Sequence, residues 1–355
     1  MAQLPAARLL AAPPDAAARR ASQLAASLAA SGEPPPASRL REPALSCVLP
    51  CYNEASNLAQ LLPVLMDEVS ALAQHWELIL VDDGSTDATA ASLTEWAGAA
   101  GIRVIQLSRN FGKEAALSAG LHAARGDVVV TLDADGQHDP ALIGSLLKAW
   151  REGADVAYAQ RRDRSDEGLL KRAGSRLFFA LLNHADRFKV PDGAGDFRLM
   201  DRAVVNALLA LPERNRFLKG LYAWVGFQAV AVPYTPAPRL HGRSHFSFLR
   251  LLRLSIDGLT AFTTWPLRAV SVVGFTLAAA AFAYGGYLTL SYLVNGHEVG
   301  GWTTIVVALM LFSGIQLISL GIVGEYVGRI FEEAKQRPLY IVKREFGAGL
   351  EAPRE

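Results

Sequence analysis

Short apolar runs alternate with stretches of helical periodicity in the first half of the chain. The apolar runs predict strands at Ser46–Leu49, Glu77–Val81, Val104–Leu107, Val128–Leu132 and Val156–Ala159. The stretches between them, with Asn57, Asp87 and Asp139 as capping residues near their starts, predict helices at Asn57–Ala73, Ala88–Ala97, Lys113–Ala124 and Pro140–Trp150. Strands that alternate with helices indicate an α/β fold with a Rossmann-like, mostly parallel sheet covered by helices.

Two long stretches without a formal charge, Ala269–Gly296 and Val299–Gly324, follow toward the C-terminus. A bilayer core of about 30 Å needs about 20 helical residues, so each stretch is long enough to span it. Two buried helices of a soluble core are the alternative, which is disfavoured because core helices rarely stay apolar on all faces over such a length. The sequence therefore predicts a two-helix transmembrane hairpin.

Positive charges predict the orientation of this hairpin. Lysines and arginines flank its outer ends, whereas its connecting loop has none; they are Arg250, Arg253, Arg268, Arg329, Lys335, Arg337, Lys343 and Arg344. Because positive charges are enriched on the cytoplasmic side of membrane spans, both flanks are expected there. We therefore expect a protein of the inner (cytoplasmic) membrane with two spans, and with the catalytic domain and both termini in the cytoplasm.

The composition divides the chain into five parts. Residues 1–44 are rich in alanine and proline and contain no apolar run typical of a secretory signal, so they are expected to form a flexible tail. The expected catalytic domain (45–238) is followed by a juxtamembrane interfacial segment (239–268), the two spans (269–328) and a cytoplasmic C-terminal tail (329–355). Phe246–Trp265 has a charged and an apolar helical face, which predicts a helix in the headgroup region, with a helix of the soluble core as the alternative.

The overall composition is consistent with this division. The chain has 355 residues, a net charge of +1, 51% hydrophobic residues and a mean hydropathy of +0.20. The charge balance argues against a nucleic-acid-binding protein, and the hairpin accounts for the apolar excess. Cys47 and Cys51 lie about 13 Å apart if the segment is extended, which is too far for a disulfide, so both are expected only to pack.

Acidic residues follow three of the predicted strands. Glu54 comes after the first strand, Asp82 and Asp83 after the second, and Asp133 and Asp135 after the fourth. Because ligands of open α/β sheets bind at the carboxyl ends of the strands, these turns are expected to meet in one crevice. Turn formation and helix capping can explain each pair alone, but three acidic turns in register favour a site. Two aspartates one residue apart suit a hard divalent cation, Mg²⁺ or Mn²⁺, that would screen a diphosphate.

Other nucleotide-dependent activities lack their motifs. No Gly-x-Gly-x-x-Gly follows the first strand, which argues against a dinucleotide-dependent dehydrogenase. The Gly112-Lys113 pair does not complete a Walker A loop, and no Gly-x-Ser-x-Gly elbow is present. The remaining candidate activity is the transfer of a group from a nucleotide-diphosphate donor.

Eight motifs resemble known glycosyltransferases. Val48–Glu54, Val81–Asp87, Arg109–Glu114 and Asp133–Gln137 resemble the motifs of family 2 glycosyltransferases with a GT-A fold. Within that family, the chain is similar to the polyprenyl-phosphate glycosyltransferases, which include dolichyl-phosphate mannose synthases, and above all to the bactoprenol (undecaprenyl-phosphate) glucosyltransferases. That similarity rests on Ala159–Ser165, Gly195–Met200, Leu211–Asn215 and Gly324–Arg329. The resemblance extends from about residue 46 to 342.

The resemblance implies roles for individual residues. Those expected to bind the nucleotide-diphosphate sugar are Pro50, Tyr52, Glu54, Asp82, Asp83 and Asp133. Asp133 and Asp135 match the metal motif, with Asp135 as the direct ligand and Gln137 assisting it. Asp196 matches a residue thought to act in catalysis. Phosphate contacts on the acceptor side are expected from Arg161, Arg164, Arg198, Arg202, Arg243 and His245, the last of which stands where the family usually has lysine.

The resemblance implies an inverting, metal-dependent hexosyltransferase, with UDP-glucose as donor and undecaprenyl (polyprenyl) phosphate as acceptor at the cytoplasmic face. A lipid phosphate is already an anion and needs little help from a base, so Asp196 is expected to position it or to act as a weak base. Transfer of mannose, N-acetylglucosamine or aminoarabinose is the first alternative, and a catalytically dead, membrane-anchored nucleotide-sugar-binding protein is the second. A processive synthase is disfavoured because no Gln-x-x-Arg-Trp motif is present. The sequence does not determine the oligomeric state, and a homo-oligomer is one of the alternatives.

Overall fold

The computed structural model describes residues 42–161, 194–214, 216–234, 265–295 and 301–350. Its soluble part is built on an eight-stranded mixed sheet with the order β7-β5-β6-β4-β1-β2-β3-β8. The strands are β1 (Leu45–Cys51), β2 (Trp76–Asp82), β3 (Ile102–Leu107), β4 (Val128–Thr131), β5 (Val156–Arg161), β6 (Ala194–Asp201), β7 (Ala229–Tyr234) and β8 (Val342–Phe346). All five strands expected from the sequence are confirmed.

Four parallel strands, in the order β4-β1-β2-β3, form the centre of the sheet. The register pairs Cys51 with Asp82 and Val48 with Thr131, so these strands end at the same edge. Three pairings are antiparallel, namely β4 with β6, β5 with β6, and β3 with β8. The other four pairings are parallel, so the expected mostly parallel sheet is confirmed, with β6 and β8 running antiparallel to their neighbours.

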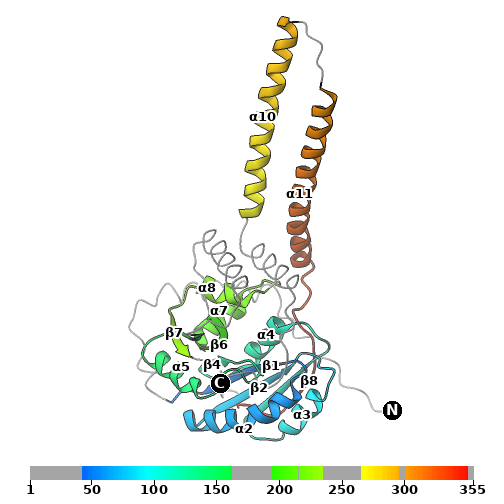
Figure 1. Ribbon diagram of the computed structural model, residues 1–355. Helices are drawn as coiled ribbons and strands as arrows, with labels where there is room; N and C mark the ends of the chain where they lie inside the picture. Colours follow the sequence, from blue (N-terminus) through cyan, green and yellow to red (C-terminus); the bar gives the residue numbers. More distant parts are fainter. Residues whose placement is uncertain (1–41, 162–193, 215, 235–264, 296–300, 351–355) are drawn as a thin grey trace, which may run out of the picture.

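Helices cover both faces of the sheet (Figure 1). They are α2 (Ala55–Leu72), α3 (Thr89–Trp96), α4 (Lys113–Ala123), α5 (Leu142–Arg151), α7 (Arg202–Ala210) and α8 (Leu218–Trp224). Alternate strand residues face opposite layers: Leu49 packs in the core with α2 and α5, whereas Val48 packs in the core with α4, α7 and α8. The four expected helices are therefore confirmed.

Two of the three expected capping residues act at helix starts. Asp87 accepts a hydrogen bond from the Thr89 amide at 2.9 Å, and Asp139 accepts one from the Ala141 amide at 3.0 Å. The expectation for Asn57 was wrong, because α2 begins earlier and Asn57 lies within its first turn. There the side-chain Nδ2 of Asn57 donates to Glu54 Oε2 at 2.5 Å.

Two long apolar helices, α10 (Trp265–Asn295) and α11 (Trp302–Ala334), project side by side from one end of the soluble domain (Figure 1). Their segments Ala269–Ser291 and Ile305–Ala334 are long and apolar enough to cross a membrane, and neither is buried by the protein. This exposure argues against two helices of a soluble core. The expected tail (1–44) lies almost entirely outside the described residues, and so does the expected interfacial helix, of which only Trp265 is described.

The end of α11 is fastened to the soluble domain. The Arg214 amide donates to Glu333 Oε1 at 2.8 Å. Beyond the helix, β8 pairs with β3 and forms the edge of the sheet, and Arg103 Nε lies 2.5 Å from Glu345 Oε1. The segment 329–355, expected to be a tail, thus contains the last turn of α11 and a strand of the sheet.

Gly84 permits the close approach of two turns. Its φ is +68°, in the left-handed region that favours glycine, and an added Cβ would lie 2.6 Å from the Asn110 amide nitrogen. Gly153 also has a positive φ, +114°, but an added Cβ there meets nothing within 4 Å. Alanine at either position would strain the left-handed backbone, but only alanine at Gly84 would also clash with neighbouring atoms.

Replacing Gly84 by alanine should lower the free energy of unfolding by about 1 to 3 kcal/mol more than Gly153→Ala does, because only Gly84→Ala adds a clash. Thermal unfolding of the two purified variants measures the difference. Equal losses in the two variants would show that the turns can separate without cost.

Candidate active site

The structure brings the acidic turns together at the carboxyl edge of the parallel strands. Glu54 lies close enough to the carboxylates of Asp135 and Asp133 to interact with them electrostatically. Burial raises the pKa of Glu54 above its usual value, and these two negative charges raise it further, against the opposing hydrogen bond from Asn57. Carboxylates that repel one another in this way form a site for a cation or for several hydrogen-bond donors.

Side-chain hydrogen bonds tie the first two turns to each other. Asn53, which has a positive φ of +58°, accepts a bond from the Thr86 amide at 2.9 Å and donates its own amide to Ser85 Oγ at 3.0 Å. The Glu54 amide donates to Thr89 Oγ1 at 2.9 Å. The neighbouring Tyr52 is left 44% exposed. The turn after β1 is therefore fixed relative to the turn after β2.

Asp82 and Asp83 organise the loops around them. Asp82 is buried and accepts bonds from the Ser85 amide at 2.9 Å and from Gln106 Nε2 at 3.2 Å. Asp83 accepts bonds from the amides of Phe111 at 2.7 Å and Gly112 at 2.9 Å. Burial raises the pKa of Asp83, although these two amides oppose the rise. Asp83 thus holds the loop that leads into α4 and fixes the start of that helix.

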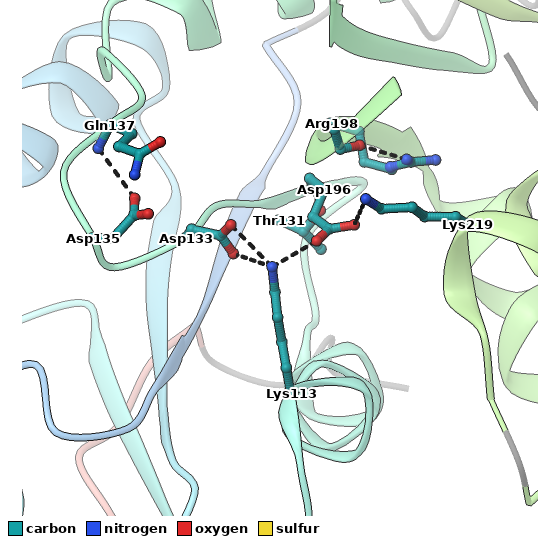
Figure 2. A network of polar contacts seen from close by, with 9 residues as sticks. Lys113, Thr131, Asp133, Asp135, Gln137, Asp196, Arg198 and Lys219 are labelled. Atoms are coloured by element: carbon teal, nitrogen blue, oxygen red, sulfur yellow. Dashed lines mark hydrogen bonds and ion pairs between the residues drawn. The ribbon is translucent and has the colours of Figure 1, made fainter. Parts of the chain in front are cut away.

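The first residue of α4, Lys113, joins two carboxylates from different strands (Figure 2). Its Nζ lies 2.7 Å from Asp133 Oδ1 and 2.5 Å from Asp196 Oδ2. A second ammonium, Lys219 Nζ from α8, lies 4.0 Å from Asp196 Oδ1. Neither lysine was among the residues that the sequence predicted for the site. A signal for Lys113 was present, because a lysine that opens the helix after a central parallel strand lies at the ligand-binding edge.

These ion pairs set the protonation of the centre. Burial acts to raise the pKa of Asp196, but the nearby ammonium groups of Lys113 and Lys219 outweigh it and lower that pKa to about 2. Burial likewise acts to lower the pKa of Lys113, and the charges of Asp133 and Asp196 raise it above its usual value. Asp196 therefore stays ionised near neutral pH and is a poor base.

Arg198, expected to contact phosphate, is engaged within the protein. The residue is only 4% exposed, and its guanidinium lies 3.5 Å from the centre of the Tyr222 ring. Its Nη2 donates to the Gly195 carbonyl at 2.6 Å. Arg198 thus supports the strand that carries Asp196, with its charge directed into the protein.

The structure does not bring Arg202 to the site. Its Nε donates to the Gly126 carbonyl at 2.8 Å. Strand register places it at the opposite end of the sheet, because the preceding Asp201 pairs with Val128, the first residue of β4. Arg202 therefore joins β6 to the loop before β4.

The remaining expected residues differ in how the structure places them. Asp135 accepts a bond from the Gln137 amide at 3.1 Å, and Gln137 Nε2 is buried without a hydrogen-bond partner. Pro50 lies in β1 and pairs with Val81. Arg161 ends β5, but its side chain is outside the described residues, as are Arg164, Arg243 and His245 entirely.

The donor set at this edge fits a divalent cation that arrives with its ligand. Among the residues that the structure describes, no cluster of three or more histidine, cysteine or acidic side chains forms a complete metal site. Asp133 and Asp135 supply hard oxygen ligands, although both Asp133 oxygens already contact Lys113 Nζ, at 2.7 and 2.9 Å. A cation beside Asp135 would relieve the repulsion that Glu54 experiences. Mg²⁺ is commonly held in this way, by one or two carboxylates together with phosphate oxygens and waters.

Comparisons with known proteins agree with this architecture. Residues 46–209 match the model of glycosyl transferase family 2, and residues 265–330 match the GtrB C-terminal hairpin. An uncharacterized glycosyltransferase of Synechocystis sp. is 42% identical over 304 residues, which cover 85% of this chain and 96% of that protein. The bactoprenol glucosyl transferase of Shigella phage SfV is 39% identical over 302 residues, covering 85% of this chain and 98% of that protein.

Among solved structures, the mannosyltransferase PcManGT from Pyrobaculum calidifontis, in complex with GDP-Man and Mn²⁺, is similar with a TM-score of 0.44 and 19% identity. The similarity covers 78% of this chain and 88% of that one. The helix-covered sheet, its acidic edge and the apolar hairpin define a membrane-associated glycosyltransferase with a GT-A fold. The chain belongs to glycosyl transferase family 2 and carries the GtrB C-terminal hairpin.

Glu114, next to Lys113, gives the centre a measurable pH dependence. Burial raises the pKa of Glu114 to about 7, and the charge of Asp196 adds to the rise. Its Oε2 is buried without a hydrogen-bond partner. Because the folded state binds this proton more tightly than the unfolded chain does, the contribution of Glu114 to stability falls as pH rises from about 4.5 to 7.

The Glu114→Gln variant should lack this loss, which is about 3 kcal/mol, so its unfolding temperature should exceed that of the native chain more at pH 8 than at pH 5. Unfolding followed by intrinsic fluorescence in detergent, across that pH range, measures the difference. Glu152→Gln, which removes an exposed carboxyl, is the control. A pH profile unchanged by Glu114→Gln would contradict the assignment.

Proposed function

We propose that the protein is an inverting glycosyltransferase that moves a hexose, glucose from UDP-glucose, to undecaprenyl phosphate at the cytoplasmic face of the membrane. The observation that carries the proposal is the ion-paired centre, in which Lys113 joins the acidic donor edge at Asp133 to Asp196, on a domain fastened to an apolar hairpin. The bactoprenol glucosyl transferases of Shigella phages, 38–39% identical to this chain, support the choice of sugar and acceptor.

The donor half of the site is the acidic edge. Asp133 and Asp135 are the residues to hold Mg²⁺ or Mn²⁺ against the donor diphosphate, and the cation would neutralise charge on the departing nucleotide. Tyr52 and Glu54, fixed by the hydrogen bonds between the first two turns, suit contact with the nucleoside, beside Pro50 and the buried Asp82.

The acceptor brings its own nucleophile. A phosphate oxygen attacks the anomeric carbon, forming a new C–O bond as the bond to the nucleotide diphosphate breaks, and attack from the opposite face inverts the configuration. A phosphomonoester is ionised at neutral pH, so no proton has to be removed. Asp196, with a pKa of about 2, therefore serves to position charged groups. Arg161, Arg164, Arg243 and His245 are proposed as further acceptor contacts.

The hairpin suits a lipid acceptor. The polyprenyl chain stays in the bilayer, so its phosphate can meet the enzyme only near the membrane surface. The hydrogen bond from Arg214 to Glu333 fastens the soluble domain to the end of one span, which supports an acceptor held at the membrane. The similarity to family 2 glycosyltransferases and to the bactoprenol glucosyl transferases favours a transferase over a scaffold.

A panel of nucleotide sugars with undecaprenyl phosphate tests the donor and the acceptor directly. Purified protein with Mg²⁺ or Mn²⁺ should form lipid-linked glucose from UDP-glucose faster than it forms lipid-linked products from donors of mannose, N-acetylglucosamine or aminoarabinose. Preference for another sugar would replace the donor assignment. Nucleotide binding without turnover of any donor would favour the catalytically dead protein.

The Asp135→Asn variant should lower kcat at least about a hundredfold, because the charge that holds the cation against the leaving group is lost. Titration of Mn²⁺ in the presence of UDP, followed by electron paramagnetic resonance, should show weakened metal binding in the same variant. Asp67→Asn, on the exposed side of α2, removes an equivalent charge and should change neither. Full activity of an Asp133→Asn/Asp135→Asn double variant would refute the metal assignment.

Cysteine labelling tests the orientation. Cys47 and Cys51 are buried, so an introduced cysteine is the reactive one. A membrane-impermeant maleimide should label His297→Cys, in the loop between the spans, in intact spheroplasts. It should label Lys343→Cys, on β8, only after permeabilisation. The reverse pattern would place the catalytic domain outside the cytoplasm.

A further inference from the structure

Two lysines, Lys113 and Lys219, present their ammonium groups to the same carboxylate at the centre of the site (Figure 2). They come from different helices, α4 and α8, and contact different oxygens of Asp196. Their side chains remain 42% and 35% exposed, whereas Asp196 is 17% exposed. The carboxylate thus lies between two cations that solvent and a ligand can reach (Figure 2).

The two contacts are unequal. Lys113 is held at 2.5 Å from Asp196 and at 2.7 Å from Asp133, which are the distances of charge-assisted hydrogen bonds. Lys219 lies at 4.0 Å from Asp196, beyond hydrogen-bond distance. A loose, partly exposed ion pair contributes little to stability, so Lys219 can change partner at small cost.

Arg198, in contrast to Lys219, cannot change partner at small cost. Arg198 is buried on the Tyr222 ring and bonded to the Gly195 carbonyl, so moving it outward would break both contacts. Tyr222 belongs to α8, the helix that carries Lys219. The arginine therefore fixes the helix, and the lysine on that helix faces the ligand side.

We propose that Lys219, assisted by Lys113, binds the phosphate of the lipid acceptor, and that Asp196 occupies the position between the two ammonium groups until that phosphate arrives. A phosphate oxygen takes the position of the Asp196 oxygen beside Lys219. The ammonium group of Lys219 thus exchanges one anionic partner for another without leaving the site. Ammonium groups suit this exchange because they bind phosphate as point charges without a fixed plane. The inference deepens the proposed function and rests on it.

The test compares Lys219→Gln with Lys148→Gln in the full-length protein. Lys148 also belongs to an ion pair of about the same length, 3.9 Å from Glu152, but lies on the surface of α5. Lys219→Gln should raise the KM for undecaprenyl phosphate about tenfold and leave the KM for UDP-glucose unchanged, because only the acceptor loses a contact. Lys219→Arg, which keeps the charge, should recover most of the loss, and Lys148→Gln should match the native chain.

A binding measurement complements the kinetics. The ³¹P resonance of farnesyl phosphate should shift on addition of the native protein in detergent, and the shift should be largely lost with Lys219→Gln but retained with Lys148→Gln. A raised KM for UDP-glucose with an unchanged acceptor KM would overturn the proposal and assign Lys219 to the donor diphosphate. An unchanged acceptor KM and ³¹P shift in Lys219→Gln would also overturn it. Failure of the native protein to glycosylate any polyprenyl phosphate would instead refute the proposed function.

Discussion

The ammonium group of Lys113 lies between the carboxylates of Asp133 and Asp196, and the organisation of the site depends on this contact. Asp133 follows a central parallel strand, whereas Asp196 lies on β6, which runs antiparallel beside that strand. Without a cation between them, two carboxylates at this distance would repel each other. The ion pairs therefore join the turn after β4 to β6 at the centre of the site, and the nearby ammonium groups lower the pKa of Asp196.

Several structural features serve to place that one ammonium group. Asp83 accepts bonds from two amides in the loop before α4, and Gly84 lets that loop approach closely. Arg198, buried on Tyr222, supports the strand that carries Asp196. The charged residues nearest to the chemistry are thus positioned by others, such as Asp83 and Arg198, whose charges are satisfied within the protein.

The hairpin and the soluble domain form one structure. Arg214 contacts Glu333 at the end of α11, and β8 then completes the edge of the sheet beside β3. The chain thus returns from the apolar helices into the catalytic domain. This return limits how far the site can move from the two apolar helices, a constraint that suits the proposed lipid phosphate acceptor.

The sequence by itself determined the central strands, the helices between them, the acidic turns at their ends and the two apolar helices, because local periodicity and apolar length encode these features. The order of the sheet was decided only by tertiary structure. Strand β6 inserts between β4 and β5 through contacts that are distant in sequence. For the same reason, sequence did not separate Arg198 and Arg202 from Lys113 and Lys219. All four are cations whose surroundings the sequence does not reveal, but burial and strand direction place the arginines against the protein and the lysines at the ligand edge.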